Sequence, residues 1–195
     1  SEKYPPEEDN VIADNDIFWN NFNYYAGAPF PLRPPSAEAT PYPVGVGVLL
    51  FGGRRNVIES NRIFGNYLAG AAAVQQFLLQ DESAKDLIGN QVKDNQFGRG
   101  GTDPNGRDLV YDGNGTGNCF GPNEGVQTTF PADGSTFVPC PFSGANTFSP
   151  AVQQEMVTWA LDATHTAYWV KREHPPIEGV TPLETYATYT GPKPE

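Results

Sequence analysis

Short segments of this chain repeat one arrangement of polar and apolar positions. Each segment has two asparagines five residues apart with an apolar residue between them, and the four copies are residues 15–20, 61–66, 90–95 and 118–123. In the first three copies, another apolar residue lies three positions before the first asparagine: Ile12, Ile58 and Leu87. A pattern that returns at a coarse interval is typical of stacked structural units, so the sequence predicts a solenoid.

The spacing around each asparagine predicts a corner between two short strands. Ile58 and Ile63 lie five residues apart, with Asn61 between them. A helical stripe would need apolar residues about three, four and seven positions apart. A single flat strand would place residues about five apart on opposite faces. A corner places both isoleucines inside, and asparagine suits it because this residue tolerates left-handed backbone angles.

Stacked corners predict a ladder of asparagine side chains. Equivalent residues of neighbouring coils would lie about 4.8 Å apart, so that their amides bond each other. The intervals between the first asparagines of the four copies are 46, 29 and 28 residues, which fits coils plus loops. We therefore expect one ladder made of Asn15, Asn61, Asn90 and Asn118.

Residues 56–66 read Asn-Val-Ile-Glu-Ser-Asn-Arg-Ile-Phe-Gly-Asn, and residues 10–20 follow the same pattern. Both segments resemble the repeat of right-handed parallel β-helix proteins, the pectin-lyase-like superfamily. The resemblance covers about residues 10–125. It implies an all-β fold, a right-handed parallel β-helix of about four to five coils, of which this chain is the C-terminal portion. The superfamily includes polysaccharide lyases, hydrolases, epimerases and inert scaffolds, so the resemblance transfers no activity.

Proline and glycine divide the chain into parts. Residues 1–125 are expected to form the coils, interrupted by a proline-rich inserted loop at 23–43 that cannot form a ladder of backbone bonds. Residues 126–148 are expected to form an irregular strap, and residues 149–195 an α-helix followed by an extended proline-rich tail. Ser149 suits the helix N-cap and Pro150 its first position. The helix is expected to cover the final coil, the side of the stack, or a partner.

The two cysteines, Cys119 and Cys140, predict a disulfide. Cys119 precedes Phe120, which is expected to point inward, so the cysteine would point outward and tie the strap to the last coil. Closing such a loop is worth roughly 3 kcal/mol in the chain-entropy model. A disulfide implies an oxidising compartment, and hence a secreted, periplasmic or cell-surface protein. Two unrelated buried thiols are the alternative.

The net charge and the hydropathy of the chain limit the kinds of partner that it is expected to bind. The net charge is −11, which argues against nucleic acid because no basic patch can release phosphate counterions. The longest apolar stretch, residues 44–51, is too short for membrane insertion. The residues before Asn10 offer no apolar cap, and an uncovered first coil would be prone to aggregation. We therefore expect the chain to stack against another protein subunit or against missing N-terminal coils.

One oxygen-rich segment is a candidate metal site. Its residues, which alternate with glycine turns, are Asp103, Asn105, Asp108 and Asp112. Oxygen ligands of this kind suit calcium, which is the only cofactor that the sequence indicates. The same residue types also form ordinary turns, which leaves that alternative open.

The sequence favours a non-catalytic function. The signatures of nucleophilic hydrolases, metalloproteases and phosphate loops are absent. The leading hypothesis is an extracytoplasmic structural or binding module of a larger surface protein or assembly. Aromatic residues of the inserted loop would contact a protein or polysaccharide, or pack back on the coils: Tyr24, Tyr25, Phe30 and Tyr42. The alternative is a carbohydrate-active enzyme, a polysaccharide lyase, hydrolase or epimerase. Its charged candidates are Asp94, Asp103, Asp108, Arg62, Lys93 and Arg99.

Overall fold

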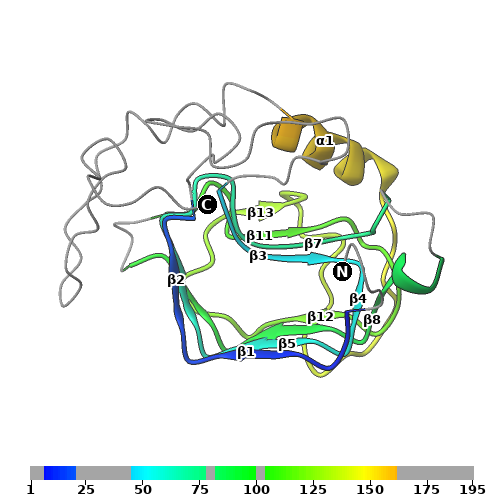
Figure 1. The fold of residues 1–195 in the computed structure, drawn as a ribbon, viewed down its shortest axis with the longest axis horizontal. Helices are drawn as coiled ribbons and strands as arrows, with labels where there is room; N and C mark the ends of the chain where they lie inside the picture. The colour runs from blue at the N-terminus through cyan, green and yellow to red at the C-terminus, as the bar shows by residue number, and fades with distance from the viewer. Residues whose placement is uncertain (1–6, 21–44, 78–81, 100–103, 162–195) are drawn as a thin grey trace, which may run out of the picture.

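The chain forms a stack of short parallel strands. A computed structural model describes residues 7–20, 45–77, 82–99 and 104–161. Within these ranges the strands pair in parallel, in several sheets, with partners that are distant in sequence. Successive levels of the stack nearly superpose in Figure 1. The arrangement is compatible with a parallel β-solenoid, which confirms the expectation of mainly parallel β structure with a helix near the C-terminus.

Each sheet takes no more than one strand from each level of the stack. The first sheet contains β1 (Val11–Ala13), β5 (Val57–Glu59), β9 (Gln91–Lys93) and β12 (Cys119–Phe120), in that order. The second contains β2 (Asp16–Phe18), β6 (Arg62–Phe64) and β10 (Gln96–Phe97). The third contains β3 (Val46–Phe51), β7 (Ala69–Val74), β11 (Leu109–Tyr111) and β13 (Thr129–Phe130). β4 (Gly53–Arg54) pairs with β8 (Leu87–Ile88) in a smaller sheet.

We refer to the levels of the stack as layers 1 to 4, comprising the described residues within 10–54, 56–88, 90–116 and 118–130. A short 3-10 helix, η1 (Glu82–Ala84), lies in layer 2 between β7 and β8. The layers are joined by strand pairing and by the packing of equivalent side chains inside the stack.

The interior is a set of aliphatic and aromatic rows. On the first sheet, residues that pair in register form one row: Ile12, Ile58, Val92 and Phe120. On the second sheet, Ile17, Ile63 and Phe97 form another. Ile58 is 1% exposed and Ile63 is 0% exposed. Burying a side chain of this size stabilises the folded state by about 1.5–3 kcal/mol, so the rows are a major source of stability.

Helix α1 (Pro150–Leu161) covers the outer face of the third sheet, as Figure 1 shows. Ser149 is its N-cap, because its hydroxyl oxygen accepts a hydrogen bond from the backbone N–H of Val152 at 3.4 Å. Met156 packs against a cluster on that face that includes Ala72 and Val110. Of the placements expected from the sequence, the helix therefore takes the one along the side of the stack.

Asparagine side chains at the corners form three ladders within the described residues. They are Asn10, Asn56, Asn90, Asn118 and Asn146; then Asn15, Asn61, Asn95 and Asn123; then Asn20, Asn66 and Asn105. Asn61 donates from both its backbone N–H and its Nδ2 to the Oδ1 of Asn95, each at 3.0 Å. The same pair of bonds recurs at every step of the three ladders between layers 1 and 4, so side-chain amides hold these three corners.

The single ladder expected from the sequence is wrong in its register. Asn90 accepts hydrogen bonds from Asn56 rather than from Asn61, whose partner is Asn95. Leu87 differs from the expectation in the same way. It pairs with Gly53, and the residue that pairs with Ile58 is Val92. The reason is that layers 1 and 2 each carry asparagines at three corners five residues apart. The first asparagine of a two-asparagine segment can therefore belong to either of two corners.

The left-handed backbone lies one residue before the asparagine, and not on it as expected. Ser60 and Asp94 have φ angles of 57° and 56° and precede Asn61 and Asn95. The other non-glycine examples that precede a ladder asparagine are Asp9, Asp14, Trp19 and Arg55. The asparagine therefore contributes through its amide bonds, while its neighbour makes the turn.

We predict that Asn95→Ala destabilises the protein by about 2–4 kcal/mol, measured by urea unfolding. The substitution removes the Oδ1 that accepts from the Asn61 backbone N–H, which is then buried without its acceptor, and it also removes the bonds that the Asn95 Nδ2 donates to the Ile58 and Lys93 carbonyls. Asn15→Ala is the matched control at the exposed end of the same ladder, where a loss of less than about 1 kcal/mol is expected. Equal losses for the two variants would contradict the role of the ladder.

Candidate functional site

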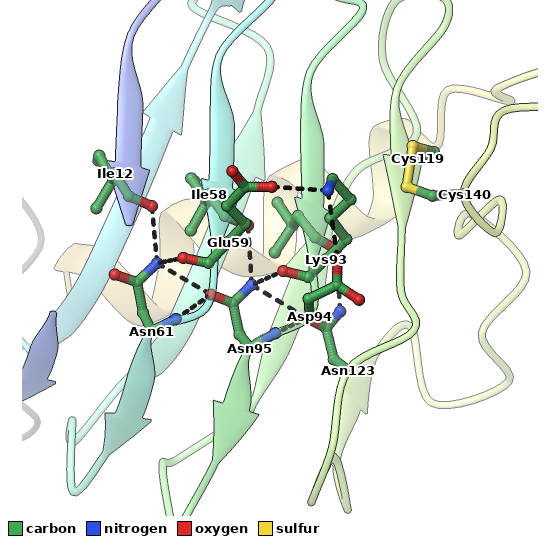
Figure 2. Close-up of polar contacts among 11 residues, drawn as sticks. Ile12, Ile58, Glu59, Asn61, Lys93, Asp94, Asn95, Cys119, Asn123 and Cys140 are labelled. Carbon is green, nitrogen blue, oxygen red and sulfur yellow. Dashed lines mark hydrogen bonds and ion pairs between the residues drawn. A yellow bond between two sulfur atoms is a disulfide. The ribbon is translucent and has the colours of Figure 1, made fainter. Parts of the chain in front are cut away.

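The corner between the first and second sheets shows how one amide joins three layers. Figure 2 shows Asn61, Asn95 and Asn123 stacked along the axis. The Nδ2 of Asn95 donates to Asn123 Oδ1 in layer 4 at 3.1 Å and to the carbonyl of Ile58 in layer 2 at 2.9 Å. It also donates to the carbonyl of Lys93 in its own layer at 2.9 Å. Every atom of this buried amide therefore serves the stack, which leaves none for a ligand.

The charged residues on the outside of this corner are paired between layers. The Lys93 ammonium lies 2.7 Å from the Glu59 carboxylate and 3.3 Å from that of Asp94, as Figure 2 shows. Glu59 and then Asp94 raise the pKa of Lys93, because both favour its protonated form. A lysine that abstracts a proton near neutral pH needs a lowered pKa instead. Lys93 therefore does not fit the proton abstractor of a lyase.

The remaining charged candidates are also occupied. Arg62 forms an ion pair and two hydrogen bonds with Asp16 of the neighbouring layer. The Arg99 guanidinium carbon lies 5.5 Å from the ring centroid of Phe64, and that ring stacks on Phe18 with centroids 5.0 Å apart. The sequence pattern did not predict this aromatic pair, although both rings follow the inward isoleucine of their repeat. Each of these contacts therefore joins side chains of neighbouring layers.

The structure places the described members of the expected calcium loop in structural hydrogen bonds. Asn105 ends the third ladder, and its Nδ2 donates to Asp108 at 3.0 Å. The Asp108 carboxylate accepts from the backbone N–H groups of Gln127 and Thr128 at 2.8 and 3.0 Å. In the part of the chain that the structure describes, no group of three or more His, Cys, Asp or Glu residues could hold a metal ion. Asp103 lies outside the described residues.

Asp112 is a buried junction between layers and helix α1. Its carboxylate accepts from the backbone N–H of Gln75 in layer 2 at 2.8 Å and from that of Asn114 at 2.9 Å. Gln153 of α1 donates its side-chain amide to the same carboxylate at 3.3 Å, and the Ser149 N–H donates to the Asp112 carbonyl at 2.7 Å. Burial raises the pKa of Asp112, whereas the hydrogen bonds lower it by less.

The C-terminal end of the stack is closed by the predicted disulfide. Cys119 of β12 and Cys140 are bonded, 21 positions apart in sequence, which confirms the pairing (Figure 2). The backbone N–H of Phe120 donates to the Val138 carbonyl at 2.7 Å, and that of Cys140 donates to the Gly121 carbonyl at 3.3 Å. The strap therefore runs beside β12 and covers its outer edge.

Side chains of the strap complete this closure. Phe137 packs edge-on against Phe120 with ring centroids 5.0 Å apart, and it also contacts Tyr111. Pro139 and Pro141 flank Cys140 and have no N–H to donate to a further strand. The strap thus covers the ring of Phe120, which is the last residue of the inward row on the first sheet, and presents an edge that is poor in backbone N–H donors.

The opposite end of the stack is open over β1 and β2. Ile12 and Ile17 are only partly buried, whereas their counterparts in layer 2 are almost completely buried. The asparagines of layer 1 are exposed, and no described residue donates a hydrogen bond to Oδ1 of Asn10, Asn15 or Asn20. Among the described strands, β1 and β2 each pair on one side only. Val48 and Leu50 of β3 are buried, so the open region lies over β1 and β2, from Asn10 to Asn20.

The aromatic residues expected to contact a partner, Tyr24, Tyr25, Phe30 and Tyr42, lie outside the described residues. No helix in the described ranges is both long and apolar enough to cross a membrane. Comparisons of the chain with protein-family models, with curated proteins and with solved structures found no significant match. The function is therefore inferred from the geometry of the two ends of the stack.

We predict that reducing the disulfide lowers the free energy of unfolding by roughly 3 kcal/mol, the value expected for a loop of this length. The measurement is urea unfolding with and without a thiol reductant. The Cys119→Ala/Cys140→Ala double variant is the control, because its unfolding should be the same in both conditions. A wild-type midpoint that does not change on complete reduction would show that the strap does not depend on the bond.

We also predict a pH dependence that comes from Asp112. Its folded pKa is raised above the unfolded value of about 3.9, so the folded state keeps a proton that the unfolded state has released. The contribution of Asp112 to stability is therefore fully present below about pH 3.9 and is lost as pH rises through the folded pKa. The stability of the wild type relative to Asp112→Asn should fall over that window, as measured by urea unfolding at several pH values.

Asp133 provides a control of opposite sign for this titration. The backbone N–H of Ser135 lowers the pKa of the exposed Asp133, so its contribution is present above about pH 3.9 and is lost as pH falls. The stability of the wild type relative to Asp133→Asn should therefore rise with pH. Parallel slopes for the two variants would contradict the assignment of the raised pKa to buried Asp112.

Proposed function

We propose that this chain is an extracytoplasmic structural and binding module that terminates a β-helix in a larger surface protein or assembly. The observation that carries the proposal is the difference between the two ends of the stack. One end is covered by the Cys119–Cys140 strap, while the other leaves Ile12 and Ile17 partly exposed. A solenoid needs its terminal hydrophobic layers covered, so a module with one finished end fits a terminal position.

The location and the finer fold are part of the same proposal. The disulfide supports an oxidising compartment, and hence a secreted, periplasmic or cell-surface protein. The repeat of residues 56–66 supports a right-handed β-helix of the pectin-lyase-like kind with about four to five coils. These assignments agree with a scaffold that must remain folded outside the cytoplasm.

A non-catalytic function is supported by the use that the stack makes of its charged groups. Lys93 forms an ion pair with Glu59, and Arg62 forms one with Asp16. Arg55 forms ion pairs with both Glu8 and Asp9. Exposed ion pairs of this kind add little stability on their own. Their effect here is to engage the basic groups that a polyuronate lyase would need free beside its substrate.

We predict that the intact chain does not cleave polygalacturonate or alginate. Incubation with each polymer should give no unsaturated product by ultraviolet absorbance and no new reducing ends, while an authentic lyase and hydrolase serve as positive controls. The Lys93→Met variant is assayed in parallel. Turnover by the wild type that is lost in Lys93→Met would contradict the proposal and establish a carbohydrate-active enzyme.

A further inference from the structure

The asparagine ladders have a direction. At each step the asparagine of the earlier layer donates, and the Oδ1 of the later layer accepts. Asn15 donates to Asn61, which donates to Asn95, which donates to Asn123, and Figure 2 shows the last two steps. The acceptor atoms of each layer therefore serve the layer before it. At layer 1 these acceptors belong to the open end.

The open end therefore presents a defined set of unmet acceptors. They are the Oδ1 atoms of Asn10, Asn15 and Asn20, at positions five residues apart at three successive corners. Between them lie the partly buried side chains of Ile12 and Ile17, whose equivalents become fully buried when another layer lies on each side. The set thus matches the surface that each inner layer presents to the layer before it.

The rim of this end is acidic. Asp14 and Asp16 flank Asn15 and are both exposed, and Asp16 already pairs on its other side with Arg62 of layer 2. An incoming layer with a basic residue directly after its middle asparagine would place that residue beside Asp16. A basic residue at this position would add charge complementarity to the amide bonds.

We propose that the open end of layer 1 binds a parallel β-strand layer of another polypeptide that carries asparagines at three positions five residues apart. The incoming layer would donate its backbone N–H and Nδ2 groups to Asn10, Asn15 and Asn20 and cover Ile12 and Ile17 with its own apolar residues. This inference rests on the proposed function and names the partner's chemistry. The interface would be a continuation of the contacts already present between layers 1 and 2.

The sequence and the ladder direction exclude this chain as its own partner. Residues 10–20 and 56–66 are the segments with asparagines at three such positions, and both already lie in the stack. Two copies placed end to end through layer 1 would bring Oδ1 acceptors against Oδ1 acceptors. A head-to-tail contact would meet the strap, where Pro139 and Pro141 offer no N–H.

The test uses the full chain and a synthetic peptide with the sequence of residues 56–66, which has the three asparagines, two isoleucines and an arginine after the middle asparagine. Nuclear magnetic resonance titration should shift the side-chain amides of Asn10, Asn15 and Asn20 and the methyl groups of Ile12 and Ile17. The peptide must be ordered on binding, so we expect a dissociation constant of about 0.1–1 mM.

Two matched controls make the test specific. A peptide with leucine in place of its three asparagines keeps its size and its charge but loses the Nδ2 donors, and should bind at least about tenfold more weakly. The Asn15→Asp variant of the full chain, with the unaltered peptide, should lose affinity by less, because the carboxylate still accepts hydrogen bonds. The inference would be overturned by equal binding of the two peptides or by shifts at other residues. It would also be overturned by no binding at a peptide concentration of about 5 mM, which is 5-fold above the weakest expected dissociation constant.

Two further outcomes separate this inference from the proposed function. Sedimentation that shows a dimer abolished by Asn15→Arg would identify a second copy as the occupant and overturn the choice of partner. Cleavage of a polyuronate by the chain would remove the proposed function, whatever the peptide does. A missing peptide interaction without cleavage would remove only the inference about the partner.

Discussion

The structure depends on the pair of hydrogen bonds that one asparagine donates to the Oδ1 of the asparagine in the next layer. A residue with a left-handed backbone, such as Ser60, turns the chain at each corner, and the backbone N–H that follows, on Asn61, has its acceptor on the Asn95 side chain. The side chain supplies the acceptor that strand pairing does not supply at a corner. Since the bonds also fix which residues of successive layers face each other, they set the isoleucine rows inside and the ion pairs outside.

The direction of these bonds gives the stack two different ends. At one end the ladder runs into the strap, where Asn146 accepts from Asn118 and the disulfide holds the chain in place. At the other end, the acceptors of layer 1 face away from the stack. Asp112 adds a second constraint at the side, because it ties Gln75 of layer 2 to Gln153 of α1. The fold is therefore closed at the side and at one end, and this asymmetry supports a terminal structural module.

The sequence predicted the corners, the parallel strands, the helix start at Ser149 and the disulfide, because each follows from a local signal such as the apolar–asparagine–apolar spacing around Asn61. It did not predict the register. Asn90 and Asn61 follow the same local pattern, and the difference between their corners arises from how much chain lies between β7 and β8. The function of Asp108 and Asp112 was also not predictable, since an aspartate that accepts backbone N–H bonds and one that binds a cation have the same local sequence.

The most direct test of the account is hydrogen exchange at the backbone N–H groups of Asn56, Asn61 and Asn66. Each of these groups lies at a corner and donates to an asparagine side chain of the next layer. If the ladders join the layers, these N–H groups exchange as slowly as those of Ile58 and Ile63 within the neighbouring strands, through unfolding of the whole stack. Exchange at the fast rate of exposed loop amides, while the strands remain protected, would contradict the central role of the ladders.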